Sequence, residues 1–96
     1  MLNDIASICP LLKSYGILTV VDSVAGMFGE DVRVDDWKID LLCGGSQKAL
    51  SAPPGLTMVT LSADAKAAME NRKTPIASFY ANLLTFKGYY LSLIHI

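Results

Sequence analysis

Apolar residues near the start of the chain recur at helical spacing. The residues on this stripe are Leu2, Ile5, Ala6, Cys9 and Leu12. Their spacing predicts a helix that ends near Tyr15, with Gly16 as its C-terminal cap. Pro10 lies inside the pattern, and proline both removes a backbone hydrogen bond and clashes with the preceding turn. We therefore expect a kink at Pro10 or a helix broken in two.

Three short apolar runs then predict three strands. Residues 17–21 form a nearly continuous run that ends at Asp22, which is typical of a strand covered on both faces. Residues 39–43 and 56–61 are the second and third runs. The segment between them, residues 44–55, is too short and too rich in glycine and proline for a crossover helix. We therefore expect the third strand to run antiparallel to the second.

The remaining segments predict turns and helices. Residues 23–30 contain two glycines and predict a turn, and residues 35–37 predict a brief helical turn. Ser62 is placed to cap a helix over residues 63–72. Residues 78–90 are apolar and aromatic and predict a last helix. This order predicts an α/β fold with a mostly parallel sheet, helices on both faces and an antiparallel last strand, in which ligands bind at the carboxyl ends of the strands.

The composition favours a segment of a larger protein over a free-standing domain. The chain has 96 residues, of which 52% are hydrophobic and 18% are charged. A domain this small has difficulty burying enough apolar surface, and it needs polar residues to cover its exterior. We therefore expect residues 1–90 to be an internal part of a larger domain, whose other parts cover its apolar faces.

The last six residues are expected to differ from the rest in origin, the alternative being an ordinary apolar strand. LSLIHI, at positions 91–96, matches the translation of a transposon adapter used in sequencing libraries, and we expect these residues not to be native. They include His95, the only histidine of the chain. Without His95 the chain cannot build Ser-His-Asp or Cys-His catalysis or a histidine metal site, so we expect no metal.

Charge and cysteine content exclude several classes of partner. The net charge is −1 and the charged residues are scattered, so the chain has no electrostatic footprint for nucleic acid or an acidic membrane. No signal peptide opens the chain, and no apolar run approaches membrane-spanning length. Cys9 and Cys43 lack the spacing of a disulfide framework, which indicates small buried residues in a reducing compartment. We expect a cytoplasmic protein, with an organelle as the alternative.

Asp22 and Lys48 carry the candidate chemistry. Asp22 ends an apolar run, where a carboxylate either caps a turn or serves a ligand. Burial would raise its pKa unless a cation such as a protonated pyridine nitrogen lay nearby. Lys48 stands between an apolar run and a proline turn, an unfavourable place for a lysine that only serves solubility. Held away from water, its amine would have a lowered pKa and would be available for Schiff-base formation.

Together the two residues indicate a site for pyridoxal 5'-phosphate (PLP). This cofactor needs a lysine to hold its aldehyde carbon and a carboxylate to keep its ring nitrogen protonated. Two neighbouring strand ends can present these groups to opposite ends of one ring. After displacement by an amino substrate, Lys48 would be free to move the substrate's α-proton as general base and acid.

Two strings of the sequence resemble the class V aminotransferases, most of all the alanine–glyoxylate and serine–pyruvate group. They are VDSVA at residues 21–25 and GSQKALSAPPG at residues 45–55, and the spacing from Asp22 to Lys48 also matches. The resemblance covers residues 4–90. It implies a fragment of the large domain of a fold-type I PLP enzyme. When complete, such an enzyme is a homodimer that transfers an amino group from alanine or serine to glyoxylate or pyruvate.

The resemblance also implies roles for single residues. Lys48 would hold the cofactor through a Schiff base, and Asp22 would bind its pyridine nitrogen. Val24 would pack on one face of the ring, and Gln47 would lie beside the cofactor near its phosphate. On the residues alone, Val24 is equally a core valine and Gln47 a loop residue. Ser46, like the serine after Asp22, is either a hydrogen-bond donor to the site or a turn former.

Three alternatives stay open. The chain lacks the phosphate cup, the stacking aromatic residue and the carboxylate-binding arginine of the family, so we expect the fragment itself to be inactive. A non-catalytic remnant or interaction module is therefore one alternative. A lyase or desulfurase of the same fold is another, although desulfurases place histidine where Gln47 stands. A nucleotide-binding module built on residues 44–46 has the wrong glycine spacing.

Overall fold

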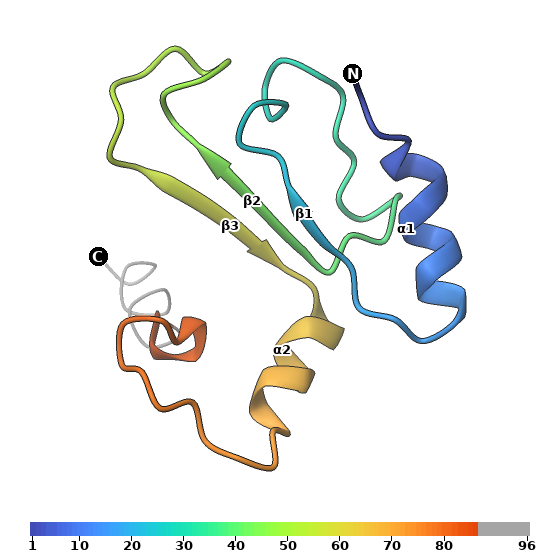
Figure 1. Cartoon of the computed structure of the whole chain (residues 1–96), viewed down its shortest axis with the longest axis vertical. Helices are drawn as coiled ribbons and strands as arrows, with labels where there is room; N and C mark the ends of the chain where they lie inside the picture. Colours follow the sequence, from blue (N-terminus) through green and yellow to red (C-terminus); the bar gives the residue numbers. More distant parts are fainter. Residues whose placement is uncertain (87–96) are drawn as a thin grey trace, which may run out of the picture. The chain divides into compact units, whose positions relative to one another are not determined.

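The computed structural model describes residues 1–86 of the chain (Figure 1). The elements are, in order, α1 (Ile5–Ser14), β1 (Val20–Asp22), β2 (Leu41–Gly45), β3 (Thr57–Leu61), α2 (Ala63–Glu70) and the 3-10 helix η1 (Leu83–Phe86). The described residues fall into two compact units, one formed by Met1–Ala65 and one that begins at Lys66. The adapter-like tail with His95, and the end of the helix predicted over residues 78–90, lie outside the described residues.

Helix α1 ends as the sequence predicts. Tyr15 is its C-cap, and Gly16 follows with a φ of 73°. The N–H groups of Gly16 and Ile17 donate to the carbonyl oxygens of Lys13 and Leu12, at 3.0 and 3.1 Å. These two bonds form a Schellman motif, which satisfies carbonyl groups that have no partner within the helix. The predicted cap at Gly16 is therefore confirmed.

Of the two alternatives expected at Pro10, a kink or a helix broken in two, the broken helix is wrong. Helix α1 is continuous over Ile5–Ser14, with Pro10 inside it. Proline removes one hydrogen bond of the helix, the one to the carbonyl of Ala6. The neighbouring Cys9 is buried in the core, at 2% exposure, so packing of the helix on the sheet offsets the lost bond.

The three strands form one mixed sheet in the order β1-β2-β3 (Figure 1). Strand β1 is parallel to β2, with Asp22 opposite Cys43. Strand β3 is antiparallel to β2, with Gly45 opposite Thr57. The α/β class and the antiparallel last strand are thus confirmed, and the carboxyl ends of β1 and β2 lie at the same edge of the sheet.

All three strands begin later than their apolar runs predict, β3 by one residue and β1 and β2 by more. Strand β1 begins at Val20, because the N–H of Ile17 closes the Schellman motif and the N–H of Thr19 donates to Asp40 Oδ2 at 2.9 Å. Strand β2 begins at Leu41, because the N–H of Asp40 donates to Thr19 Oγ1 at 3.0 Å. Backbone groups used in this way are not available to the sheet.

The core lies between α1 and one face of the sheet. Cys9, Ile39 and Leu42 are each 2% exposed. Partly buried apolar residues surround them: Ile5, Val21, Met27, Val32, Val34 and Trp37. The core therefore includes residues of the predicted turns at 23–30 and 35–37, both of which form turns in the structure.

Single residues of β1 and β3 are exposed on the opposite face of the sheet. Val21 packs on the core, so the alternation of a strand directs its neighbours Val20 and Asp22 to the other face. Val20 is 72% exposed, and Val59 of β3 is also exposed. The expectation that the first strand is covered on both faces concerns the larger domain, and it stays a prediction about chain outside this segment.

Helix α2 has the predicted cap, whereas the last predicted helix does not form as expected. The Ala65 N–H donates to Ser62 Oγ at 3.0 Å. Within residues 78–86 only η1 is helical. The Ser78 hydroxyl accepts from the N–H of Ala81, and the Asn82 carboxamide oxygen accepts from that of Leu84. Such local side-chain bonds compete with the α-helical pattern.

The helices formed by residues 1–86 are all too short or too polar to cross a membrane.

Candidate active site

The candidate site lies where β1 and β2 end. Asp22 is the last residue of β1, and the next N–H, of Ser23, donates to the carbonyl of Cys43 at 2.9 Å. This bond extends the pairing of the two strands past Asp22. Lys48 follows the end of β2 at Gly45 by three residues. The structure therefore brings the two loops that carry Asp22 and Lys48 to one edge of the sheet.

Asp22 is exposed, and one of its oxygens is used locally. Its Oδ1 accepts a hydrogen bond from the N–H of Val24 at 3.0 Å. This Asx turn fixes the direction of the carboxylate and leaves Oδ2 without a hydrogen bond among residues 1–86. Val24 is partly buried. The turn-capping interpretation of Asp22 is thus correct, and it leaves one oxygen available for a ligand.

The Lys48 side chain is exposed and has no hydrogen bond or ion pair within residues 1–86. Its carbonyl accepts from the N–H of Ser51 at 2.9 Å, which closes a turn just after the lysine. Ser51 has a φ of 59°, a left-handed conformation that only glycine and a few polar residues adopt readily. A tight loop therefore presents an amine that no residue among 1–86 engages.

Ser46 closes the base of the loop that carries Lys48, residues 46–56, which we call the lysine loop. It is 2% exposed, and its Oγ donates to the carbonyl of Pro53 at 2.6 Å. Its backbone N–H donates to the carbonyl of Leu56 at 3.1 Å. Of the two interpretations of Ser46, the structure favours the turn former, because its hydroxyl is engaged inside the loop.

Gln47 lies beside Gly45 and is exposed. A Cβ added to Gly45 would lie 2.6 Å from Gln47 Oε1, so the carboxamide lies over the glycine backbone. Glycine at position 45 therefore provides the space that this side chain occupies.

A cavity of about 350 Å³ adjoins Asp22, between the start of α1 and the loop after β1. Its lining includes Asp22, Ser23 and Trp37, but not Lys48, Gln47 or Val24. The chain thus brings the predicted site residues to one edge, but this cavity does not enclose them all.

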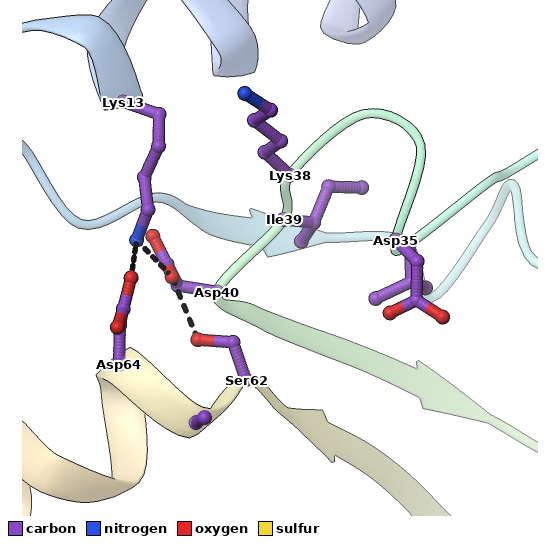
Figure 2. Close-up of a pocket in the computed structure, with 9 residues that line it drawn as sticks. Lys13, Asp35, Lys38, Ile39, Asp40, Ser62 and Asp64 are labelled. Atoms are coloured by element: carbon purple, nitrogen blue, oxygen red, sulfur yellow. Dashed lines mark hydrogen bonds and ion pairs between the residues drawn. The ribbon is translucent and has the colours of Figure 1, made fainter.

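A second cavity, of about 270 Å³, lies at the other edge of the sheet and contains a network of polar residues. Asp40 is 2% exposed, and Lys13 donates to its Oδ1 at 2.6 Å. Ser62 donates to the same oxygen at 2.7 Å, and Lys13 also pairs with Asp64 at 2.8 Å. Figure 2 shows Lys13 directed from α1 toward both carboxylates. With the Thr19 N–H on Asp40 Oδ2, this network joins α1, the starts of β1 and β2, and the β3–α2 turn.

The network shifts the pKa values of its charged members. Burial alone raises the pKa of Asp40, but hydrogen bonds from Lys13, Ser62 and the Thr19 N–H outweigh it and lower that pKa below its ordinary value. Hydrogen bonds to Asp40 and Asp64 raise the pKa of Lys13. The hydrogen-bond and ion-pair partners of Lys13 and Asp40 are thus all residues of this chain, which indicates a structural role. Asp40 is not among the functional residues predicted from the sequence, where its only signal is a carboxylate directly before a buried strand.

We expect Asp40→Asn to destabilise the packing of α1 on the sheet by about 3 kcal/mol, because the substitution removes the charge of a buried acceptor that Lys13, Ser62 and the Thr19 N–H all engage. Hydrogen exchange of the amides of α1 and β1, measured in the full-length protein, should then be faster by roughly 10²-fold. Asp35→Asn is the matched control, since Asp35 lines the same cavity but is exposed and points away from Lys13 (Figure 2). Equal exchange in both variants would contradict this role.

The contribution of the network also depends on pH. Because the folded pKa of Asp40 is lowered, its stabilisation is present above about pH 3.9 and is lost as the pH falls through the lower folded value. Because the folded pKa of Lys13 is raised, its stabilisation is present below about pH 10.4 and is lost as the pH rises through the higher folded value. The difference between wild type and Asp40→Asn should therefore shrink below about pH 4.

Comparison with known proteins identifies relatives over nearly the whole chain. The family described as aminotransferase class-V matches residues 1–89. An uncharacterised aminotransferase of Methanocaldococcus jannaschii is 40% identical over 88 residues, which are 92% of this chain and 23% of that protein. The alanine–glyoxylate aminotransferase of Rattus norvegicus is 41% identical over 73 residues, 76% of this chain and 18% of that protein.

A solved structure has the same fold. The crystal structure of ureidoglycine–glyoxylate aminotransferase from Bacillus subtilis superposes with a TM-score of 0.87 at 34% identity. The match covers 93% of this chain and 23% of that one. The chain thus spans about a fifth of the length of the relatives it matches.

Proposed function

Because the chain belongs to the class V aminotransferase family, we propose that it forms the part of a PLP-binding large domain in which Lys48 binds the cofactor and Asp22 pairs with the ring nitrogen. The chain has the α/β fold of that fold-type I domain. The observation that carries the proposal is the parallel pairing of β1 and β2, which places the Asp22 turn and the lysine loop at the same edge of the sheet.

The free groups at this edge fit the cofactor. Lys48 offers an amine with no hydrogen bond or ion pair among residues 1–86, and Asp22 offers an oxygen that its Asx turn leaves unused. When bound, PLP supplies an electron sink for the electrons released as the substrate loses its α-proton. Asp22 would hold a proton at the ring nitrogen by charge pairing. Lys48 would carry the α-proton as base and acid. Val24 would contact a ring face, and Gln47 would lie near the phosphate.

We further propose that the complete protein transfers an amino group from a small amino acid, alanine or serine, to a 2-oxo acid, glyoxylate or pyruvate. The names of similar proteins, an alanine–glyoxylate, a serine–glyoxylate and a ureidoglycine–glyoxylate aminotransferase, support alanine, serine and glyoxylate. We propose a homodimer for the complete protein. The compartment proposed is the cytoplasm, with an organelle as the alternative, and the free thiols of Cys9 and Cys43 are compatible with reducing surroundings.

Residues 1–90 are proposed as the native part of this domain and residues 91–96 as the adapter-derived tail. By itself the chain is proposed to be inactive. The second candidate function, a non-catalytic remnant, is favoured by the exposure of Asp22 and Lys48, because a working site needs chain outside this segment to exclude water. A lyase or desulfurase of the same fold remains the alternative within the enzyme class.

The proposal is tested on the full-length protein that contains this segment. We expect purified protein to absorb visible light after addition of PLP, and borohydride to fix the cofactor on the peptide that contains Lys48, as mass spectrometry would show. An amino-group transfer assay with alanine or serine and glyoxylate or pyruvate then identifies the substrate pair. Elimination products in place of transfer would favour the lyase. The absence of any bound PLP would favour the remnant and overturn the proposal.

A further inference from the structure

The loop after Asp22 contacts β2 and the lysine loop at two places. In each contact one of the two partners is a glycine. Met27, in the loop after β1, packs against Gly44 of β2 so closely that a Cβ on Gly44 would overlap the Met27 thioether. This contact places the first loop against the end of β2. The polypeptide that follows Asp22 therefore lies directly beside the strand that leads into the lysine loop.

A second contact lies farther along both loops. A Cβ added to Gly29 would lie 3.0 Å from Cβ of Ala49, the residue next to Lys48. This separation is shorter than an ordinary carbon–carbon contact of about 3.5–4.0 Å. The Gly29 φ lies outside the left-handed region that favours glycine, so its backbone admits alanine. What position 29 lacks is room for a methyl group, and Ala49 occupies that room.

We propose that the contact between Gly29 and Ala49 sets the position of Lys48 relative to Asp22. Consecutive Cα atoms are separated by a fixed distance of about 3.8 Å, so a displacement of Ala49 moves Lys48 with it. The Ser51 N–H bond to the Lys48 carbonyl closes the turn on the other side of Ala49 and carries the displacement to the lysine backbone. Ala49 is thus a positioning residue, and its methyl group packs against the backbone of Gly29, where there is no side chain. This inference rests on the proposed roles of Lys48 and Asp22.

The test is a double-mutant cycle in the full-length protein. Gly29→Ala should push the lysine loop outward by a few tenths of an ångström and lower kcat by roughly five- to tenfold, with little change in KM, because proton transfer depends on the position of the amine. Ala49→Gly removes the opposing methyl group, so the double variant Gly29→Ala/Ala49→Gly should return to within about twofold of the Ala49→Gly single variant. The visible absorbance of the bound cofactor should shift in Gly29→Ala and return in the double variant.

Gly26→Ala is the matched control. Among residues 1–86, a Cβ on Gly26 would meet only Ser23 Oγ, at 3.3 Å, within its own loop. We therefore expect Ala49→Gly to restore kcat when it is combined with Gly29→Ala, and to leave the kcat of Gly26→Ala unimproved. If Gly29→Ala protein does not accumulate, Ala49→Val presses on the same contact from the lysine loop and should lower kcat in the same way.

Two outcomes would overturn the inference. One is a Gly29→Ala enzyme with unchanged kcat and absorbance, and the other is a double variant no better than Gly29→Ala. Failure of the proposed function is distinguishable, because the wild-type protein would then form no borohydride-stable adduct at Lys48.

Discussion

Replacement of Lys48 by alanine in the full-length protein is expected to abolish covalent attachment of PLP and to lower kcat by roughly 10³-fold or more. Two separate functions are lost with one amine, the nucleophile that holds the cofactor and the base that moves the α-proton. General acid–base catalysis alone contributes about 10²–10⁴-fold. The Lys48 side chain is exposed and makes no hydrogen bond or ion pair within residues 1–86, so its truncation should leave the fold intact.

Lys66→Ala is the matched control for Lys48→Ala. Lys66 is an exposed residue of α2, where alanine is at least as favourable for the helix. Both variants are reduced with borohydride in the presence of PLP, digested and mapped, and the transfer reaction is followed in parallel. Cofactor still fixed at a defined peptide of Lys48→Ala, with kcat preserved, would remove Lys48 from its proposed role.

Most of the fold could be predicted because apolar runs and turn residues agree along the chain. Gly16 as a helix cap, Ser62 as a helix cap and the antiparallel third strand all follow from local chemistry, and the structure confirms them. The starts of β1 and β2 could not be predicted in this way. They depend on the exchange of hydrogen bonds between Thr19 and Asp40, which are 21 positions apart and are brought together only by the fold.

The same contrast between local signals and long-range contacts applies to the candidate site. Asp22 and Lys48 were found from residue type, strand ends and the family motif, because these properties are local. Long-range contacts left no comparable signal. Nothing in the sequence shows that Ala49 fits against Gly29, since a glycine in a turn is explained by the turn itself. The exposed Val20 face likewise depends on what lies outside residues 1–86.

Asp22→Asn is expected to lower kcat by roughly 10²-fold or more while the protein still forms its adduct at Lys48. The exchange keeps an oxygen that can accept from the Val24 N–H, so the Asx turn should persist and the backbone at the end of β1 should not move. What changes is the charge. A carboxylate close to a basic nitrogen raises the pKa of that nitrogen by about 1–3 units, and an amide does not.

The measurement is the pH dependence of the visible absorbance of the bound cofactor, together with kcat for the transfer reaction. In wild type the ring nitrogen should stay protonated to a higher pH than in Asp22→Asn, whereas Asp36→Asn, a change at an exposed aspartate in the turn before β2, should match wild type. Asp22→Glu should recover part of the difference, because it restores the charge at a shifted position. A loss of kcat in Asp22→Asn without any change in the pH profile would mean that Asp22 acts only through the turn it caps. An unchanged kcat would mean that the charge facing the ring nitrogen comes from another residue.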